Sequence, residues 1–192
     1  MKIFGLGGTN GSGKDTVAAM LVDRHGFYFA SATDMLRDEL ERRGLPTDRT
    51  HKSKLSAEWR RQYGGAAIVD RAWEYYQQHE AEYQGMIVGS LRHPAEVDRI
   101  HELGGQQIWT DADPHVRYKR IIDNAHLRGR PAEDDKCFDE WQADEHREMY
   151  PEGDEATLHG AAVKDRADIV IENNDNDIEA FKDQAEQALG LA

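Results

Sequence analysis

Cysteine is almost absent from this chain of 192 residues, and Cys137 is the only one. A single cysteine excludes an internal disulfide and a four-cysteine zinc site, so nothing in the sequence requires an oxidising compartment. Long apolar runs are lacking too, because glycines and charges interrupt every hydrophobic stretch before the ~18 residues of a membrane span. Residues 1–7 reach glycine too early for the ~7–15-residue apolar core of a signal peptide. We therefore expect a cytoplasmic protein with no membrane partner.

Positive charge is also scarce. The chain carries 24 Lys and Arg residues against 37 Asp and Glu residues, which gives a net charge of −13. Duplex nucleic acid is bound through a basic surface, so this balance argues against a nucleic-acid partner and leaves room only for a local basic cleft. The length suits one domain with a sheet covered on both faces, and we expect a single domain over residues 1–192.

Short apolar segments alternate along the chain with segments of helical periodicity. We expect strands at residues 2–6, 27–30, 86–88, 107–110 and 169–171. We expect helices at residues 14–25, 34–43, 51–62, 66–80, 94–103 and 113–126, a further helix ending at 149, and a last one ending near 189. This order predicts an α/β fold, a central parallel five-stranded sheet flanked by helices, with ligands bound beyond the carboxyl ends of the strands.

The region of about 34–80 reads as a helical insertion within this fold. Its aromatic residues recur at helical intervals, which predicts core positions for Trp59, Trp73, Tyr75 and Tyr76.

A glycine-rich turn connects the first strand to the first helix. Residues 8–16 read Gly-Thr-Asn-Gly-Ser-Gly-Lys-Asp-Thr. Glycines let successive backbone N–H groups turn toward an anion, the helix N-terminus adds positive charge, and Lys14 can reach the β- and γ-phosphates of a nucleotide. A turn with a merely solvated lysine is the alternative, but the flanking strand and helix favour a P-loop NTPase fold. The expected ATP-binding residues are Gly8, Asn10, Gly11, Ser12, Gly13, Lys14, Asp15 and Thr16.

The letters after the lysine resemble those of one branch of P-loop proteins. Asp15 follows Lys14 directly and Thr16 comes one place later. Adenylate kinases have a glycine and then a threonine there, and the phage-type deoxynucleoside monophosphate kinases read Gly-Lys-Asp-Thr. The chain thus resembles the P-loop nucleoside monophosphate kinase family.

Two further segments carry the same resemblance. Residues 31–37 resemble the adenylate kinase stretch that ends Gly-Asp-Met-Leu-Arg, although Thr33 replaces the glycine. Residues 86–92 resemble the strand that ends Asp-Gly-Phe-Pro-Arg. The resemblance implies that Asp34, Arg37 and Arg92 bind the acceptor, with Arg92 between the acceptor phosphate and the γ-phosphate.

Arginines near residues 127–138 resemble the short lid of such kinases, which closes over both nucleotides. The resemblance implies a catalytic set of Lys14, Arg92, Arg120, Arg128, Arg130 and Arg147, with the last as the trailing arginine of the lid. Phosphoryl transfer needs such cations because negative charge spreads over the γ-oxygens, and the acceptor phosphate, already an anion, needs no general base.

A group of uncharacterised archaeal nucleotide-kinase-like proteins shares the order of several motifs with this chain. They have an Arg-x-x-x-Glu-Val segment, as at residues 92–97, an Asp-Glu-x-Arg-Glu segment, as at 144–148, and a late Ala-Asp strand, as at 167–173. The late strand also resembles the end of dephospho-coenzyme A kinases. The substrate therefore stays open.

The resemblance also implies Mg²⁺ bound with ATP. The family's aspartate at the end of the third strand is Gly89 here, so Asp15 or Asp111 must replace it, or Thr16 and the phosphates hold the metal alone. We expect Asp15 and Thr16, because Asp15 occupies the position from which a P-loop normally supplies its metal ligand.

The expected function is ATP-dependent transfer of a phosphoryl group to a nucleoside or deoxynucleoside monophosphate. The alternatives are a dephospho-coenzyme A kinase or other small-molecule kinase and, from another class, a P-loop ATPase that acts as a switch. The absence of an Asn-Lys-x-Asp sequence argues against a GTPase, and the acceptor arginines argue against a switch. The expected partners are small-molecule nucleotides, and we expect a monomer, with a dimer as the alternative.

Overall fold

A five-stranded sheet forms the centre of the computed structural model, which describes residues 1–125 and 136–192. The strands are β1 (Lys2–Gly8), β2 (Phe27–Ser31), β3 (Gly85–Gly89), β4 (Gln106–Asp111) and β5 (Ile169–Glu172). Their spatial order is β2-β3-β1-β4-β5, and all neighbours are parallel. The predicted parallel sheet is confirmed.

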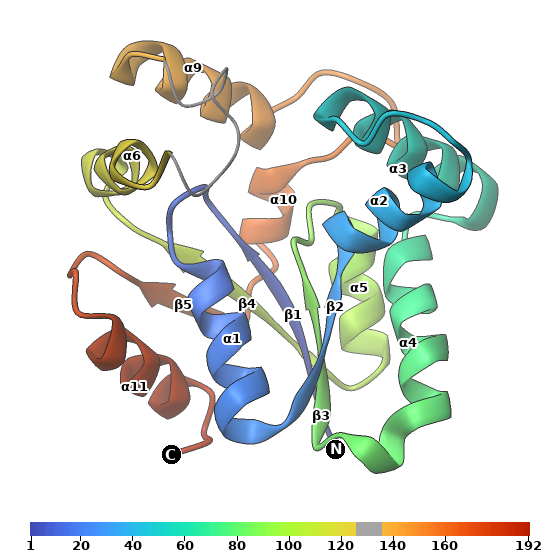
Figure 1. Cartoon of the computed structure of the whole chain (residues 1–192), viewed down its shortest axis with the longest axis horizontal. Coiled ribbons are helices and arrows are strands. Elements are labelled where there is room, and N and C mark those ends of the chain that lie inside the picture. Colours follow the sequence, from blue (N-terminus) through green and yellow to red (C-terminus); the bar gives the residue numbers. More distant parts are fainter. Residues whose placement is uncertain (126–135) are drawn as a thin grey trace.

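Helices cover both faces of this sheet (Figure 1). On one face α1 (Lys14–His25) and α11 (Ile178–Ala188) pack over apolar side chains of the central strands. On the other face lie α4 (Ala67–His79), α5 (Pro94–Glu102) and the short α10 (Gly160–Lys164). All five residues of β3 are buried as a result, as expected for a parallel strand covered on both sides.

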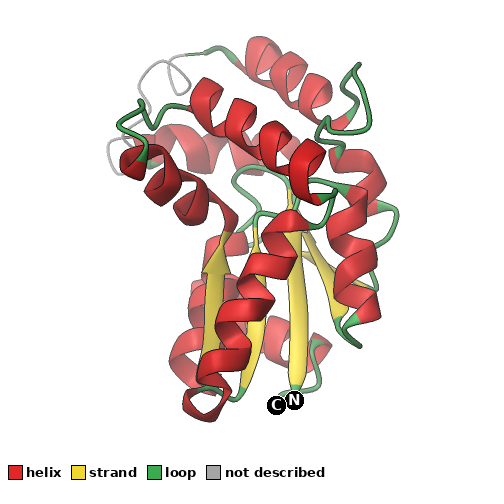
Figure 2. Ribbon diagram, turned by 90° about the vertical axis from the view of Figure 1, so that its right-hand side faces the viewer, coloured by secondary structure: helices red, strands yellow, loops and turns green. Residues whose placement is uncertain are grey.

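The remaining α-helices of the described ranges lie beyond the carboxyl ends of the strands, at the end of the molecule opposite the two termini (Figure 2). They are α2 (Ala32–Arg42), α3 (Arg49–Tyr63), α6 (Pro114–Asp123) and α9 (Phe138–Met149). Caps fix where two of them begin. Ser31 Oγ accepts the N–H of Asp34 at the start of α2, and Asp113 accepts the N–H groups of His115 and Val116 at the start of α6. These helices therefore enclose the sheet edge where ligands bind in such folds.

Two short helices, α10 and η1 (Glu80–Glu82), were not predicted, because they are too short to show an apolar period. The prediction of a core position for Tyr75 is wrong, since this residue is 44% exposed. Its neighbour Tyr76 takes the inward position on α4, and Tyr75 instead stacks on Tyr28 of the edge strand β2, 4.9 Å between ring centres. Adjacent helical residues point about 100° apart, so only one of the two can face the core.

No helix in the described ranges has the length and apolarity to cross a membrane. Most of the predicted lid, residues 127–135, lies outside the described residues.

Candidate active site

The turn between β1 and α1 has the backbone geometry of a phosphate-binding loop. Gly11 and Gly13 have φ angles of +80° and +98°, a region that side chains disfavour. Space is also restricted, because a Cβ on Gly11 would lie 2.9 Å from the carbonyl oxygen of Arg117, and one on Gly13 would lie 2.5 Å from Nδ2 of Asn173. Glycine is thus required at both positions, because a side chain would clash with a neighbour and because the φ angles disfavour one.

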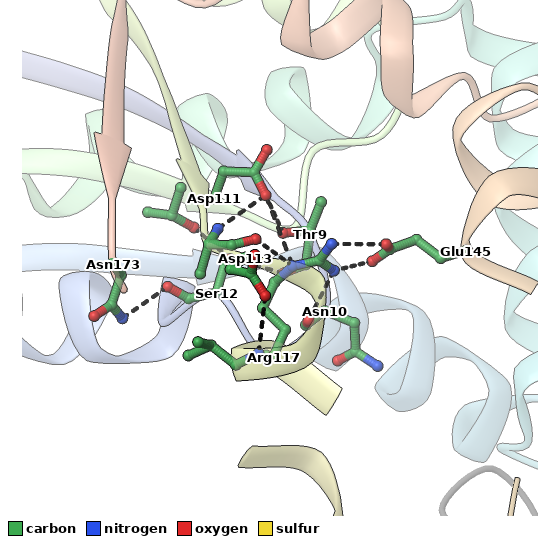
Figure 3. Close-up of polar contacts among 12 residues, drawn as sticks. Thr9, Asn10, Ser12, Asp111, Asp113, Arg117, Glu145 and Asn173 are labelled. Carbon is green, nitrogen blue, oxygen red and sulfur yellow. Dashed lines mark hydrogen bonds and ion pairs between the residues drawn. The ribbon is translucent and has the colours of Figure 1, made fainter. Parts of the chain in front are cut away.

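Buried polar contacts fix the loop to the neighbouring strands (Figure 3). Ser12 Oγ donates to the carbonyl oxygen of Thr9 and lies 2.7 Å from Thr110 Oγ1 on β4. Thr9 Oγ1 donates to Asp111 Oδ1, 2.9 Å away, and Asn173 Nδ2 donates to the carbonyl oxygen of Ser12. These contacts hold the loop in one shape, and such preorganisation lowers the ordering cost of binding a ligand.

Lys14, the first residue of α1, lies inside this loop. Its Nζ donates to the carbonyl oxygen of Thr9 at 2.6 Å. Burial, followed by repulsion from the guanidinium of Arg92, lowers the pKa of Lys14 from 10.5 to about 8. Burial makes the charged form of Lys14 less stable. The negative charge of a bound polyphosphate would stabilise that charged form.

Arg117 was not predicted to belong to the site, yet it contacts the loop directly. Its side chain is 4% exposed and donates to the carbonyl oxygens of Ala112 and Asn10, while its guanidinium pairs with Glu145 on α9 (Figure 3). It also lies 5.1 Å from the ring centre of Trp141. This buried cation ties α6 and α9 to the phosphate-binding loop.

Arg120, which was predicted, lies on the other side of the loop. It donates to the carbonyl oxygen of Asn173 at 2.9 Å and to that of Asp175. Together with Gly11, Gly13 and Thr16 it lines a cavity of about 400 Å³, which residues 173–178 after β5 also line.

Asp111 and Asp15, the two predicted alternatives for a metal ligand, occupy different environments. Asp111 is 14% exposed, and its carboxylate accepts from Thr9, from the backbone of Ala112 and from Lys164 Nζ at 2.6 Å. Burial acts to raise the pKa of Asp111, but the contacts with Lys164 and Thr9 outweigh it and hold that pKa below its ordinary value. Asp15 is exposed in the first turn of α1.

Gly89 is the last residue of β3, at the position where the resemblance to nucleoside monophosphate kinases implies an aspartate. A Cβ at this position would lie 2.4 Å from the ring of Phe29 on β2. The phenyl ring therefore fills the space that the missing side chain would need.

Arg92 follows β3 at the carboxyl end of the sheet, where Glu96 and Glu148 hold it. Ser90 adopts the left-handed conformation, with φ of +65°, and turns the chain at the end of the strand. The N–H of Arg92 then donates to Glu96 Oε2 at 2.9 Å, and Arg92 Nη1 donates to Glu148 of α9 at 3.0 Å. The positive charge of Arg92 contributes to lowering the pKa of Lys14.

The other predicted arginines are less closely associated with the loop. Arg37 pairs with Asp34, three residues before it on α2, and is 45% exposed. Arg147 pairs with Asp144 and donates to the carbonyl oxygen of Ala143, both on its own helix. Arg128 and Arg130 lie outside the described residues.

Comparison with known proteins agrees with this fold. A UPF0200 protein of Pyrobaculum aerophilum is 27% identical over 98% of this chain and 97% of its own length. Shikimate kinase from Bacteroides thetaiotaomicron superposes with a TM-score of 0.60 at 16% identity, covering 99% of both chains. A putative kinase from Chloroflexus aurantiacus gives 0.54 at 17% identity, covering 97% of both. These two structures show that the chain has the fold of P-loop kinases. The family model described as AAA domain, AAA_17, matches residues 7–138, and the chain belongs to this family.

Proposed function

We propose that this protein is a kinase that transfers the γ-phosphoryl group of ATP to a nucleoside or deoxynucleoside monophosphate. The observation that carries the proposal is the phosphate-binding loop between β1 and α1, where Gly11 and Gly13 have positive φ angles and Lys14 Nζ donates to the carbonyl oxygen of Thr9 at 2.6 Å. Lys14 belongs to the loop that would hold the donor, and Arg92 comes from the end of the neighbouring strand on the acceptor side. Two cations at this junction suit the γ-phosphoryl group as it moves between donor and acceptor.

The donor side has the parts that ATP requires. Backbone N–H groups at the start of α1 and the ammonium group of Lys14 would bind the phosphates. The cavity of about 400 Å³ lined by Arg120 and Phe181 would accept the nucleoside. The acceptor needs no general base, because a phosphate monoester is already an anionic nucleophile.

The residues near the loop fit Mg²⁺ as the accompanying cation. Within the described ranges, no group of three or more His, Cys, Asp and Glu side chains could hold a metal by itself. Mg²⁺ bound with ATP needs few protein ligands, because it keeps several waters and takes phosphate oxygens. Thr16 lines the nucleotide cavity and Asp15 lies next to it, so these two would hold the ion, which would neutralise charge on the β- and γ-phosphates when bound. Asp111 is already engaged by Thr9 and Lys164.

A panel of acceptors tests the proposal. Purified protein is incubated with Mg²⁺-ATP and, separately, each nucleoside and deoxynucleoside monophosphate, dephospho-coenzyme A and shikimate, and ADP release is measured. We expect release that depends on one or a few monophosphates and is lost in a folded Lys14→Ala variant. Release stimulated only by dephospho-coenzyme A or shikimate would identify a different small-molecule kinase. Release that no acceptor changes would favour an ATPase switch.

A further inference from the structure

Glu148 on α9 connects two arginines from separate parts of the chain. One carboxylate oxygen pairs with Arg49, the first residue of α3, and the other accepts from Arg92 Nη1 at 3.0 Å. All three side chains are accessible to solvent, at 39% for Glu148, 56% for Arg49 and 46% for Arg92. A small anion in solution could therefore reach both guanidinium groups once the carboxylate leaves.

The neighbouring acids of α9 hold other cations. Glu145 pairs with Arg117 beneath the phosphate-binding loop, and Asp144 pairs with Arg147 and Lys136. Arg49 is close enough to Asp144 to contribute to lowering its pKa. Among these carboxylates of α9, Glu148 is the one that pairs with Arg92. The positive charge of Arg92 also contributes to lowering the pKa of Lys14.

We propose that Arg49 and Arg92 together form the binding site for the phosphate of the acceptor, and that the carboxylate of Glu148 occupies this site until the acceptor displaces it. The inference rests on the proposed function for the identity of the acceptor. It assigns Arg49 a binding role and Glu148 a competing one.

Charge indicates which anion the pair prefers. Glu148 offers one negative charge and two carboxylate oxygens to the two guanidinium groups. A phosphate monoester carries a charge of about −1.5 to −2 near neutral pH and offers three acceptor oxygens, so it can satisfy both arginines at once. A carboxylate ligand offers no more charge than Glu148 already supplies. A phosphate should therefore displace Glu148 where acetate does not.

Chemical protection of individual arginines tests this arrangement without nucleotide or turnover. An arginine-selective dicarbonyl reagent is applied at increasing concentrations of inorganic phosphate, and modification of Arg49 and Arg92 is quantified by mass spectrometry of peptides. Reading the two residues separately excludes phosphate bound only in the P-loop. The proteins compared are the wild type, Glu148→Gln, Arg49→Gln/Glu148→Gln, and Glu152→Gln, which removes one exposed negative charge outside α9.

In the wild type we expect phosphate to protect both arginines and acetate to protect neither. In the Glu148→Gln variant, phosphate should protect both arginines at a concentration roughly three- to tenfold lower than in the wild type. The factor is modest because the two exposed ion pairs with Glu148 are each weak. Glu152→Gln should match the wild type, and the double variant should lose the gain at Arg92. Unfolding midpoints of all variants establish that they are folded.

An unchanged phosphate requirement in Glu148→Gln would overturn the proposal, because Glu148 would then not compete with the anion. A higher requirement would overturn it as well, since Glu148 would then orient the arginines rather than occupy their site. Expected protection together with no phosphorylated acceptor would retain the anion site and refute the kinase. A phosphorylated acceptor together with no protection of the arginines would retain the kinase and refute the anion site.

Discussion

Replacing Lys14 by methionine should stabilise the ligand-free protein while removing its response to ATP. The lysine is partly buried in the phosphate-binding loop, where its ammonium group donates to the carbonyl oxygen of Thr9 at 2.6 Å. Methionine keeps the length of the side chain and removes the charge. The substitution therefore separates the cost of burying the charge from the packing of the side chain.

The magnitude follows from the pKa of Lys14. A fall on folding from 10.5 to about 8 means that the charged lysine lowers the free energy of unfolding near pH 7 by about 3 kcal/mol. Loss of the hydrogen bond to Thr9 should offset about 1 kcal/mol of the gain. The Lys14→Met variant should thus be about 2 kcal/mol more stable than the wild type at pH 7.

The pH dependence has a definite sign. Between about pH 8 and 10.5 the unfolded chain keeps the lysine proton and the folded protein has released it, so the stability of the wild type rises with pH in this window. The advantage of Lys14→Met should therefore be constant below pH 8 and shrink as the pH approaches 10.5.

Urea unfolding of both proteins at several values between pH 7 and 10 measures this difference. Lys54→Met, which removes an exposed lysine of α3, is the control for the loss of one charge. Thermal shift with Mg²⁺-ATP should show stabilisation of the wild type and of the control but not of Lys14→Met. A variant less stable than the wild type, or a stability gain that does not change with pH, would refute the burial argument.

Three further predictions concern the other charged groups of the site. Arg92→Ala should raise the KM for the acceptor or lower kcat by the equivalent of about 1.5–3 kcal/mol, the value of a charge-assisted hydrogen bond, and steady-state kinetics with no change in either would contradict its role. Asp15→Ala should raise the Mg²⁺ concentration for half-maximal activity more than Asp111→Ala does; the reverse ranking would move the metal to β4. Arg117→Met should lower the free energy of unfolding by about 3 kcal/mol because Glu145 loses its buried partner, and a loss in urea unfolding of less than about 1 kcal/mol would show that the pair is dispensable.

The features of the structure that could be predicted from the sequence are set by residues that lie close together along the chain. The turn between β1 and α1 has its glycines and lysine within nine consecutive positions, and each strand and long helix shows its own period. Parallel pairing then follows from the alternation of strands and helices, which also places residues from the ends of different strands at one edge. Arg92 could be assigned to that edge for this reason.

The contacts that support the loop could not be predicted in the same way. Arg117 and Glu145 are 28 positions apart, and Asn173 lies 161 positions from Ser12, so only the completed fold brings them together. Residues 144–148 stood out as a shared motif, but nothing local indicates that its acids have different partners on α3, α6 and the segment after β3. Arg117 itself lies in an ordinary amphipathic helix, and its contact with Trp141 comes from the separate helix α9.

The central claim is that this loop delivers the γ-phosphoryl group to a nucleotide rather than to water. It is tested most directly by incubating the protein with ATP labelled with ³²P at the γ-position, Mg²⁺ and a mixture of nucleoside monophosphates, and separating the products. We expect the label in a nucleoside diphosphate, with little inorganic phosphate and no transfer by Lys14→Ala. Label that accumulates only as inorganic phosphate, or label transferred equally well by Lys14→Ala, would contradict the account.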